Sequence, residues 1–293
     1  MADKRNDTAV ANSIDALIPQ DIAIKAELVG ARKARQNALT LLVLATLAGA
    51  FIGLGSMFAT TVLAGTAGII PFGLARLIAG AVFSLGLILV VLGGAEFFTG
   101  NTLMVMALAG RKIRMQEMLR AWAIVYAGNF IGAICTALLV LLSGQCLSGD
   151  GAVAKVAMKL ASDKIALPFD RALFLGILCN VLVCLAVWLS IGARTTTDKI
   201  LAVIFPVSAF VAAGFEHSVA NMYIIPLGLM MLTWGPPEMW IQIGATASSF
   251  QALTWPAFFL SLIPVTIGNI VGGGALVGGV YWFVYLRNRQ DEI

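Results

Sequence analysis

The chain has 293 residues, of which 60% are hydrophobic and only 12% are charged, and its mean hydropathy is +0.94. Soluble domains carry about 25% charged residues, so this composition excludes a soluble globular protein and indicates an integral membrane protein. The net charge of +4 arises from basic residues outside the apolar segments, and it gives no support for nucleic-acid binding.

The first 37 residues are polar and mixed in charge. We expect 1–37 to be a cytoplasmic arm without a cleavable signal peptide, because no Arg/Lys-led stretch with a cleavage site opens the chain. Within it, apolar and charged positions of 20–35 alternate at a roughly helical period, which predicts an amphipathic helix. The simpler placement of this helix is on the inner leaflet, and a gate is the alternative.

Six apolar segments follow the arm, and each provides the about 20 residues that a helix needs to cross the hydrocarbon. They lie near 38–61, 72–95, 121–143, 172–192, 200–232 and 256–285. The sequence therefore predicts an all-α membrane protein with a six-helix transmembrane domain at 38–286 and a cytoplasmic tail at 287–293.

The basic residues orient this domain in the membrane. Six crossings place both ends of the chain on the same side. Most of the 19 Lys and Arg residues fall in the arm, in the loops after the second and fourth segments, and at the C-terminus, while the opposite side holds Arg76, Lys155, Lys159, Lys164 and Arg171. By the positive-inside rule both termini are cytoplasmic, in the inner (cytoplasmic) membrane of a cell.

The second and fifth segments are too long for one straight crossing. As single helices, 77–109 and 200–232 would each run about 50 Å, against about 30 Å of hydrocarbon. Each contains a polar octet of the form Gly-x-Glu-x-x-x-x-Asn, at 94–101 and 214–221. Non-helical backbone at membrane depth is tolerated only where protein or a cavity surrounds it. We therefore predict one broken helix in each half of the chain.

The repeat extends beyond the octets. Gly128-Asn129-x-x-Gly132 in the third segment matches Gly268-Asn269-x-x-Gly272 in the sixth. Small residues at this spacing allow helices to approach closely in lipid. Three crossings per half require the two halves to be inverted, and inverted repeats with paired breaks place a site near the midplane.

The octets contain the side chains that could bind a ligand or exchange a proton. His217 is the only histidine, and its counterpart in the first octet is Phe97. Imidazole can donate to an anion and exchange a proton near neutral pH; the alternative is a hydrogen-bonded core histidine. Glu96 and Glu216 share one repeat position, which favours paired structural braces over a substrate or proton role.

The first octet adds Thr99, whose hydroxyl lies in the loop matching that of His217. The half-helices that restart after the loops are expected to present free N–H groups and a positive dipole end to the centre, an arrangement suited to a small anion.

Residues outside the octets support either a functional or a structural interpretation. Lys164 and Arg171 could concentrate anions at a mouth or be ordinary loop charges, and Asn180 could join helices or line a pore. Apolar constrictions or ordinary core are the alternatives for Phe83, Leu87, Phe98, Val183 and Phe210. Packing is the expected role of the four cysteines, Cys135, Cys146, Cys179 and Cys184. None has metal-ligand spacing with the histidine, and we expect no metal or cofactor.

Three motifs resemble the formate/nitrite transporter family: Ala-Glu-Phe-Phe-Thr-Gly-Asn at 95–101, Leu-Cys-Asn-Val-Leu-Val-Cys-Leu-Ala-Val-Trp at 178–188 and Gly-Phe-Glu-His-Ser-Val-Ala-Asn-Met-Tyr at 214–223. The resemblance covers about 14–287, and 176–223 is especially similar to the formate channels. It implies a homopentamer of aquaporin-like protomers, each with six helices, broken second and fifth helices and one pore.

The resemblance also implies roles for individual residues. His217 would be the central pore histidine with Thr99 as its partner; Asn180 and Asn221 would orient it or bond around it, and Glu216 would brace it. Lys164 would draw the anion in. The resemblance implies a periplasmic-side constriction of Leu87 and Phe210 and a cytoplasmic one of Phe83, Phe98 and Val183. The anion would be protonated by or through His217 and cross as the neutral acid.

Formate is the expected substrate, and nitrite or hydrosulfide is the alternative. The first loop reads Phe97-Phe98-Thr99-Gly100-Asn101 where formate channels tend to have Leu-Phe-Thr-Ser. A water or polyol channel is disfavoured, because two Asn-Pro-Ala signatures are missing and no arginine is expected within the apolar spans. An enzyme using Glu216 and His217 is also disfavoured: metal-assisted hydrolysis needs about three ligands, and a pair such as Ser218 with His217 lacks an orienting group.

Overall fold

The computed structural model describes residues 15–288, and this part of the chain is helical throughout, without a strand. Predictions for 1–14 and 289–293, which include the start of the arm and most of the tail, lie outside the described residues. Six helices of the described part are long and apolar enough to cross a membrane, or seven if the bent pair α11 and α12, with its angle of 112°, is taken as one span.

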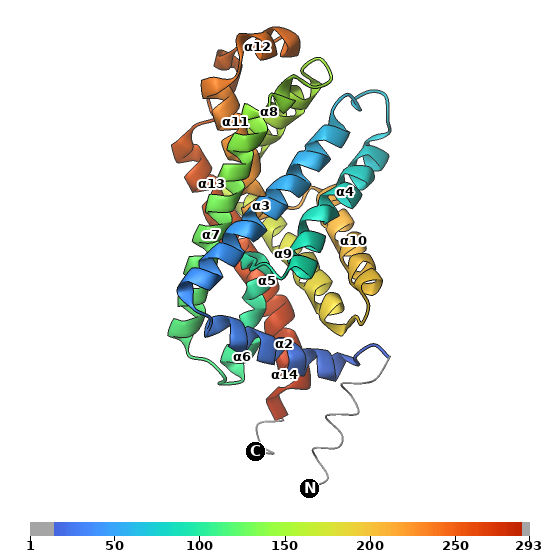
Figure 1. Cartoon of the computed structure of the whole chain (residues 1–293), viewed down its shortest axis with the longest axis vertical. Coiled ribbons are helices and arrows are strands. Elements are labelled where there is room, and N and C mark those ends of the chain that lie inside the picture. Colours follow the sequence, from blue (N-terminus) through green and yellow to red (C-terminus); the bar gives the residue numbers. More distant parts are fainter. Residues whose placement is uncertain (1–14, 289–293) are drawn as a thin grey trace.

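In chain order the elements are α2 (Pro19–Ala34), α3 (Ala38–Leu63), α4 (Phe72–Gly93), α5 (Phe98–Asn101), η1 (Thr102–Met104), α6 (Val105–Ala109), α7 (Met115–Leu142), η2 (Gln145–Leu147), α8 (Ala152–Ile165), α9 (Phe169–Gly192), α10 (Thr196–Ala213), α11 (Ser218–Trp234), α12 (Pro237–Ile243), η3 (Ala247–Phe250), α13 (Trp255–Ile270), the π-helical η4 (Val271–Gly279) and α14 (Val280–Tyr285). The six predicted segments correspond to α3, α4–α6, α7, α9, α10–α11 and α13–α14 (Figure 1).

The two predicted breaks are confirmed inside the matching octets. Helices α4 and α10 end at Gly94 (φ 71°) and Gly214 (φ 74°), a left-handed conformation that glycine adopts without the Cβ penalty of other residues. The chain then runs extended and becomes helical again at Phe98 and at Ser218. Both breaks meet near the centre of the molecule (Figure 1).

Glycines allow the long helices of each half to cross at close range. A Cβ at Gly49 of α3 would overlap the carbonyl oxygen of Asn129 on α7, and one at Gly268 of α13 would overlap that of Leu173 on α9. The crossings α3–α7 and α9–α13 occupy equivalent places in the two halves. Small residues therefore bring these backbones into contact, as the Gly-x-x-x-Gly spacing predicts.

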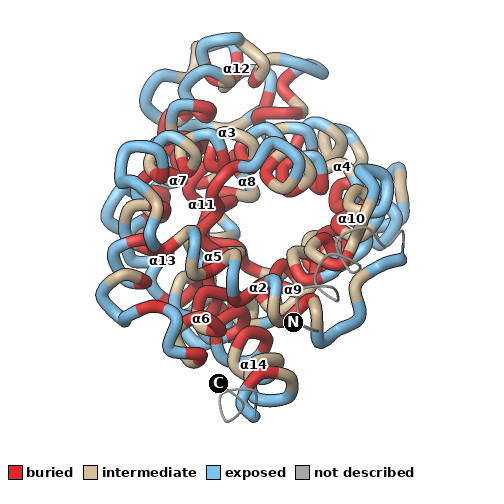
Figure 2. Tube along the Cα trace, turned by 60° about the horizontal axis from the view of Figure 1, so that its bottom comes forward, coloured by how far each residue is buried: buried red, intermediate tan, exposed pale blue. Residues whose placement is uncertain are grey.

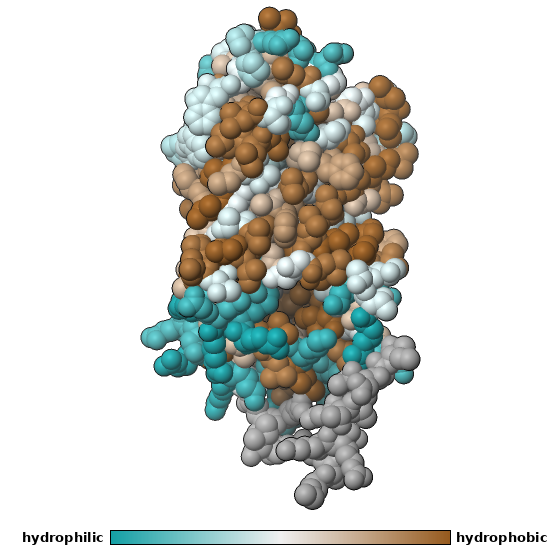
Figure 3. All heavy atoms as spheres, in the orientation of Figure 1, coloured by the Kyte–Doolittle hydropathy of each residue, from teal (hydrophilic) through white to brown (hydrophobic). Residues whose placement is uncertain are grey.

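Helix α2 crosses the end of the molecule that also carries α6 and α14, called here the α2 end, opposite the α8 end (Figures 1 and 2). It contacts η1, α6, α9 and α14, and Ile22, Ala23 and Ala26 are buried in these contacts. The predicted helix is confirmed, and it packs on protein. On the face drawn in Figure 3, hydrophilic residues gather near this end and a hydrophobic surface lies above them. Phe58, Leu85 and other large apolar residues are exposed.

Candidate functional site

His217 lies at the junction of the two helix breaks. It is buried and forms the N-cap of α11, where its Nδ1 accepts a hydrogen bond from Ala220 N–H at 3.0 Å. Its Nε2 lies 3.0 Å from Thr99 Oγ1 in the opposite break, so the two matching loops meet as predicted. Because Nδ1 accepts a bond from an amide, the neutral ring carries its proton on Nε2. A second proton on Nδ1 requires loss of the cap bond.

Two aromatic rings stack against the imidazole. Phe97 stacks on it at 5.3 Å between ring centroids and 13° between planes, and Phe210 lies at 6.0 Å and 21°. Phe83 contacts Phe210 edge-on at 5.7 Å. The imidazole thus lies among aromatic rings, and its two nitrogens make polar contacts with Thr99 and Ala220.

Phe98 points elsewhere. Its ring packs against Trp122 and Tyr126 of α7, with centroids 6.0 and 4.8 Å away. Of the two neighbouring phenylalanines, Phe97, not Phe98, faces the histidine. Sequence reasoning gave Phe97 no role, although its position opposite His217 in the repeat was a signal. Leu87 and Val183, the other predicted constriction residues, are buried in the same core.

Polar groups fix the backbone behind Thr99. Its carbonyl accepts hydrogen bonds from Thr102 Oγ1 at 2.6 Å, from Asn180 Nδ2 at 3.1 Å and from Cys184 Sγ at 3.4 Å. Asn180 also donates to the carbonyl of Asn269 at 2.6 Å. Asn180 thus contacts Thr99 and not the imidazole, and Cys184 belongs to a polar network and does more than fill space.

Both break glutamates are paired with a lysine, as the cost of burying a carboxylate leads one to expect. On the α8 side, Lys164 Nζ lies 2.9 and 3.0 Å from the two carboxylate oxygens of Glu216. Asn221 Nδ2 donates to Glu216 Oε2 at 2.8 Å. The side chain of Asn221 therefore bonds to the carboxylate, and its backbone N–H donates to the carbonyl of His217 at 3.0 Å. This pairing balances a charge that would be costly to bury alone.

The first half contains the same triad. Lys33 Nζ lies 2.9 Å from Glu96 Oε2 and donates to Asn101 Oδ1 at 3.0 Å. Asn101 Nδ2 donates to Glu96 Oε2 at 2.9 Å. Sequence reasoning missed Lys33, because it belongs to α2, outside the six spans. The shared Glu and Asn positions were the only signal that a lysine was needed here.

Two buried asparagines hold the backbone of the breaks. Asn269 accepts from Ser218 N–H at 3.0 Å and donates to the carbonyls of Glu216 and Gly176 at 3.0 and 2.8 Å. Asn129 makes the equivalent bonds in the first half, with Phe98 N–H at 2.9 Å and with the carbonyls of Glu96 and Ala45. The matched motifs at 128–132 and 268–272 are therefore the supports of the breaks.

These bonds correct one expectation. The half-helices were expected to offer free N–H groups to an anion, yet the N–H groups of Phe98 and Ser218 donate to the asparagines, and that of Ala220 donates to His217. For these amides the expectation is wrong.

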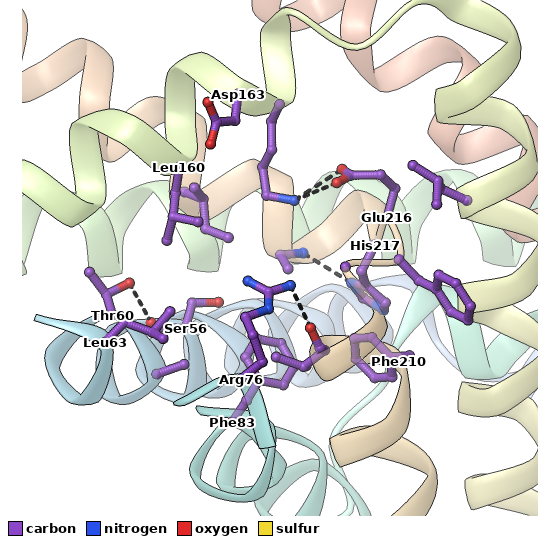
Figure 4. Close-up of a pocket in the computed structure, with 18 of the residues that line it drawn as sticks. Ser56, Thr60, Leu63, Arg76, Phe83, Leu160, Asp163, Phe210, Glu216 and His217 are labelled. Atoms are coloured by element: carbon purple, nitrogen blue, oxygen red, sulfur yellow. Dashed lines mark hydrogen bonds and ion pairs between the residues drawn. The ribbon is translucent and has the colours of Figure 1, made fainter. Parts of the chain in front are cut away.

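A cavity of about 260 Å³ leads from the α8 end to His217 (Figure 4). We call it the α8-end cavity. Its lining includes Phe83, Phe210, Lys164, Glu216, His217 and Arg76. The guanidinium of Arg76 points into it and donates from Nη2 to the carbonyl of Val211 at 2.6 Å. The expectation that no arginine lies within the apolar spans is wrong, because Arg76 belongs to α4. By contrast, Arg171 is exposed at the start of α9.

Comparison with known proteins places this arrangement in a family. A family model described as formate/nitrite transporter matches residues 20–283. The formate channel FocA of Escherichia coli K12 is 44% identical over 96% of this chain and 99% of the relative. The uncharacterized transporter YrhG of Bacillus subtilis is 41% identical over 94% and 96%.

Solved structures agree with these relatives. A pentameric formate channel with formate bound gives a TM-score of 0.81 at 41% identity, covering 85% of this chain and 98% of that one. An FNT family ion channel gives 0.77 at 31% identity, over 90% and 98%. The inverted breaks, the buried histidine and these matches lead to one conclusion: the chain belongs to the formate/nitrite transporter family.

Proposed function

We propose that the protein is a membrane channel for formate in which His217 exchanges a proton with the passing anion. The observation that carries this proposal is the pair formed by His217 Nε2 and Thr99 Oγ1, 3.0 Å apart, where the two breaks meet. The α8-end cavity gives access to it from one side. Relatives described as formate channels support formate as the substrate, and their descriptions as channels are consistent with a role that is not enzymatic.

The proton step follows from the surroundings of the ring. A bare anion loses its hydration beside Phe83, Phe97 and Phe210, and burying an unpaired charge in apolar surroundings is costly. The neutral acid avoids this cost. A proton that adds to Nδ1 displaces the Ala220 cap, and the arriving anion supplies the counter-charge for the imidazolium.

The imidazolium then gives its Nε2 proton to the Thr99 hydroxyl as this hydroxyl gives its own proton to the anion, so that the neutral acid forms and His217 is left neutral with its remaining proton on Nδ1. The ring returns to its starting tautomer by losing this proton and regaining one on Nε2. The Thr99 hydroxyl can both accept and donate a hydrogen bond, so it stays bonded to Nε2 in either state.

We infer that the protein is multi-pass in the cytoplasmic membrane, with arm 1–37 and tail 287–293 on the cytoplasmic side of channel domain 38–286. The basic residues support this orientation, because the segments 25–35, 111–120 and 194–199, together with Arg287, hold 11 of the 16 Lys and Arg residues in the described part. We further propose a homopentamer with one pore per protomer, the assembly named for a solved relative.

Transport by purified protein in liposomes tests the substrate. With a panel of formate, nitrite, hydrosulfide and acetate, we expect formate to be taken up fastest. Nitrite and hydrosulfide are the alternatives within the family. This chain differs from the Leu-Phe-Thr-Ser pattern of formate channels at Phe97, whose ring stacks on His217, and at Gly100. A faster flux of nitrite than of formate would reverse this assignment.

Replacing Lys164 with glutamine should lower formate uptake by about three- to tenfold at low external concentration, and much less at saturation. Lys164 neutralises Glu216, whose side chain is only 6% exposed. Without the lysine, the carboxylate leaves a negative charge beside the cavity, which repels the anion. Uptake rates across a range of formate concentrations measure the effect.

Two further variants control this prediction. Lys155→Gln changes an exposed lysine of the same helix that does not line the cavity, and it should leave uptake unchanged. Adding Glu216→Gln to Lys164→Gln removes the uncompensated charge and should restore part of the rate. If Lys164→Gln has no effect at any concentration, the electrostatic role is wrong.

A further inference from the structure

Arg76 lies within a membrane-spanning helix, and only some of the N–H donors of its guanidinium form hydrogen bonds. It lies one turn into α4 and is half-buried. Its Nη2 and Nε donate to the carbonyls of Val211 and Ala212, at 2.6 and 3.4 Å. A guanidinium has five N–H donors, and Nη1 has no hydrogen-bond partner among residues 15–288. The group points into the α8-end cavity (Figure 4).

The cations around this cavity differ in their counter-charges. Lys164 is held by both oxygens of Glu216, and Asp163 at the rim pairs with Lys159 at 2.7 Å. Within 15–288, no carboxylate forms an ion pair with Arg76, which contacts neutral carbonyls only. The positive charge left for an incoming anion is therefore that of Arg76.

The C-terminus of α10 does not need the two hydrogen bonds from Arg76 as its cap. The carbonyl of Val211 already accepts a hydrogen bond from Gly214 N–H at 3.1 Å, and Phe215 N–H donates to the carbonyl of Phe210 at 3.0 Å. The helix end is thus capped by its own backbone. The two bonds from Arg76 orient the guanidinium beside Gly214, whose Cβ, if it had one, would lie 3.3 Å from Nη2.

We propose that Arg76 is the anion-binding residue of the α8-end cavity and that it selects planar anions with two oxygens. This rests on the proposed channel function. The guanidinium edge formed by Nη1 and Nη2 matches a carboxylate in bidentate fashion, and nitrite presents the same pair of oxygens. Hydrosulfide and chloride each offer a single atom. Arg76 therefore favours formate and nitrite over hydrosulfide at the first binding step, before the anion reaches His217.

The Arg76→Lys variant tests this, because lysine keeps the charge but loses the planar fork. In liposomes that contain the reconstituted protein, we expect the half-saturating concentration for external formate to rise about tenfold, because lysine loses one of the two strong hydrogen bonds to the anion. The value for hydrosulfide should stay unchanged. Arg76→Gln, which removes the charge, should weaken both anions. Arg171→Lys, at an exposed arginine of the same end, is the matched control and should change neither value.

Equal changes for formate and hydrosulfide in Arg76→Lys, or no change for either, would overturn the proposal. A second measurement uses the wild-type protein and does not depend on the variant folding: external nitrite should compete with formate uptake, and chloride at the same concentration should not. Equal inhibition by chloride also contradicts the selectivity. Wild-type uptake of formate no faster than in protein-free liposomes would instead refute the channel function itself.

Discussion

Replacing His217 with phenylalanine should abolish proton-linked formate uptake, with a loss of at least ~100-fold, the scale of a missing proton-transfer group. The new ring can stack against Phe97 and Phe210 as the imidazole does, so the packing of the break is kept. The proton on Nε2, its bond to Thr99 and the cap on Ala220 N–H are lost. Formate uptake into liposomes under an inward proton gradient measures the change.

Phe97→Leu is the matched control for this variant. It alters the same stack and leaves both imidazole nitrogens in place, so the dependence of uptake on pH should persist. If instead His217→Phe keeps the pH dependence of the wild type, His217 does not exchange the proton.

Replacing Asn269 with leucine should destabilise the protein strongly. The two side chains are similar in size, but leucine leaves Ser218 N–H and the carbonyls of Glu216 and Gly176 buried without partners. Each unpaired group costs about 1–3 kcal/mol, so the free energy of unfolding should fall by ~3–9 kcal/mol. Thermal unfolding of the purified protein in detergent reports this loss.

The repeat supplies a second test of the same idea. Asn129→Leu removes the equivalent three bonds in the first half and should have an effect of similar size. Ser261→Ala on α13 removes only a local bond to the carbonyl of Phe258 and should change stability by at most about 0.5 kcal/mol. If both asparagine variants unfold at the temperature of this control, the breaks do not depend on these amides.

Much of the fold was readable because charge is costly inside a membrane. The six spans emerge from the gaps between charged residues, and the length of 200–232 together with the octet at 214–221 predicts a break where α10 ends and α11 begins. The contact of Thr99 with His217 follows from their places in matching loops. These features depend on length and repetition, which a sequence displays directly.

The features that sequence reasoning missed depend on direction in space. The extended backbone of the break decides whether Phe97 or Phe98 faces the histidine. Helical periodicity does not predict the direction of side chains in such a segment. Lys33 reaches Glu96 from α2, and Lys164 reaches Glu216 from α8, so equivalent bonds come from elements that are not equivalent in the repeat.

Arg76 illustrates a second limit. Counting charges places an arginine outside a span, yet a long side chain near a helix end can keep its head in polar surroundings. Here the head reaches the carbonyls of Val211 and Ala212. The Asn129 and Asn269 motifs were found as a repeat, but their use as backbone partners depends on how α7 and α13 face the breaks.

Formate uptake and internal pH, followed together in liposomes that contain the wild-type protein, test the central claim most directly. If formate crosses as the neutral acid formed at His217, the lumen acidifies in proportion to the formate taken up, and a potassium ionophore that collapses the membrane potential leaves the rate unchanged. Protein-free liposomes give the background of unassisted acid diffusion. Uptake without acidification, accelerated by the ionophore, would show passage of the bare anion and contradict the account.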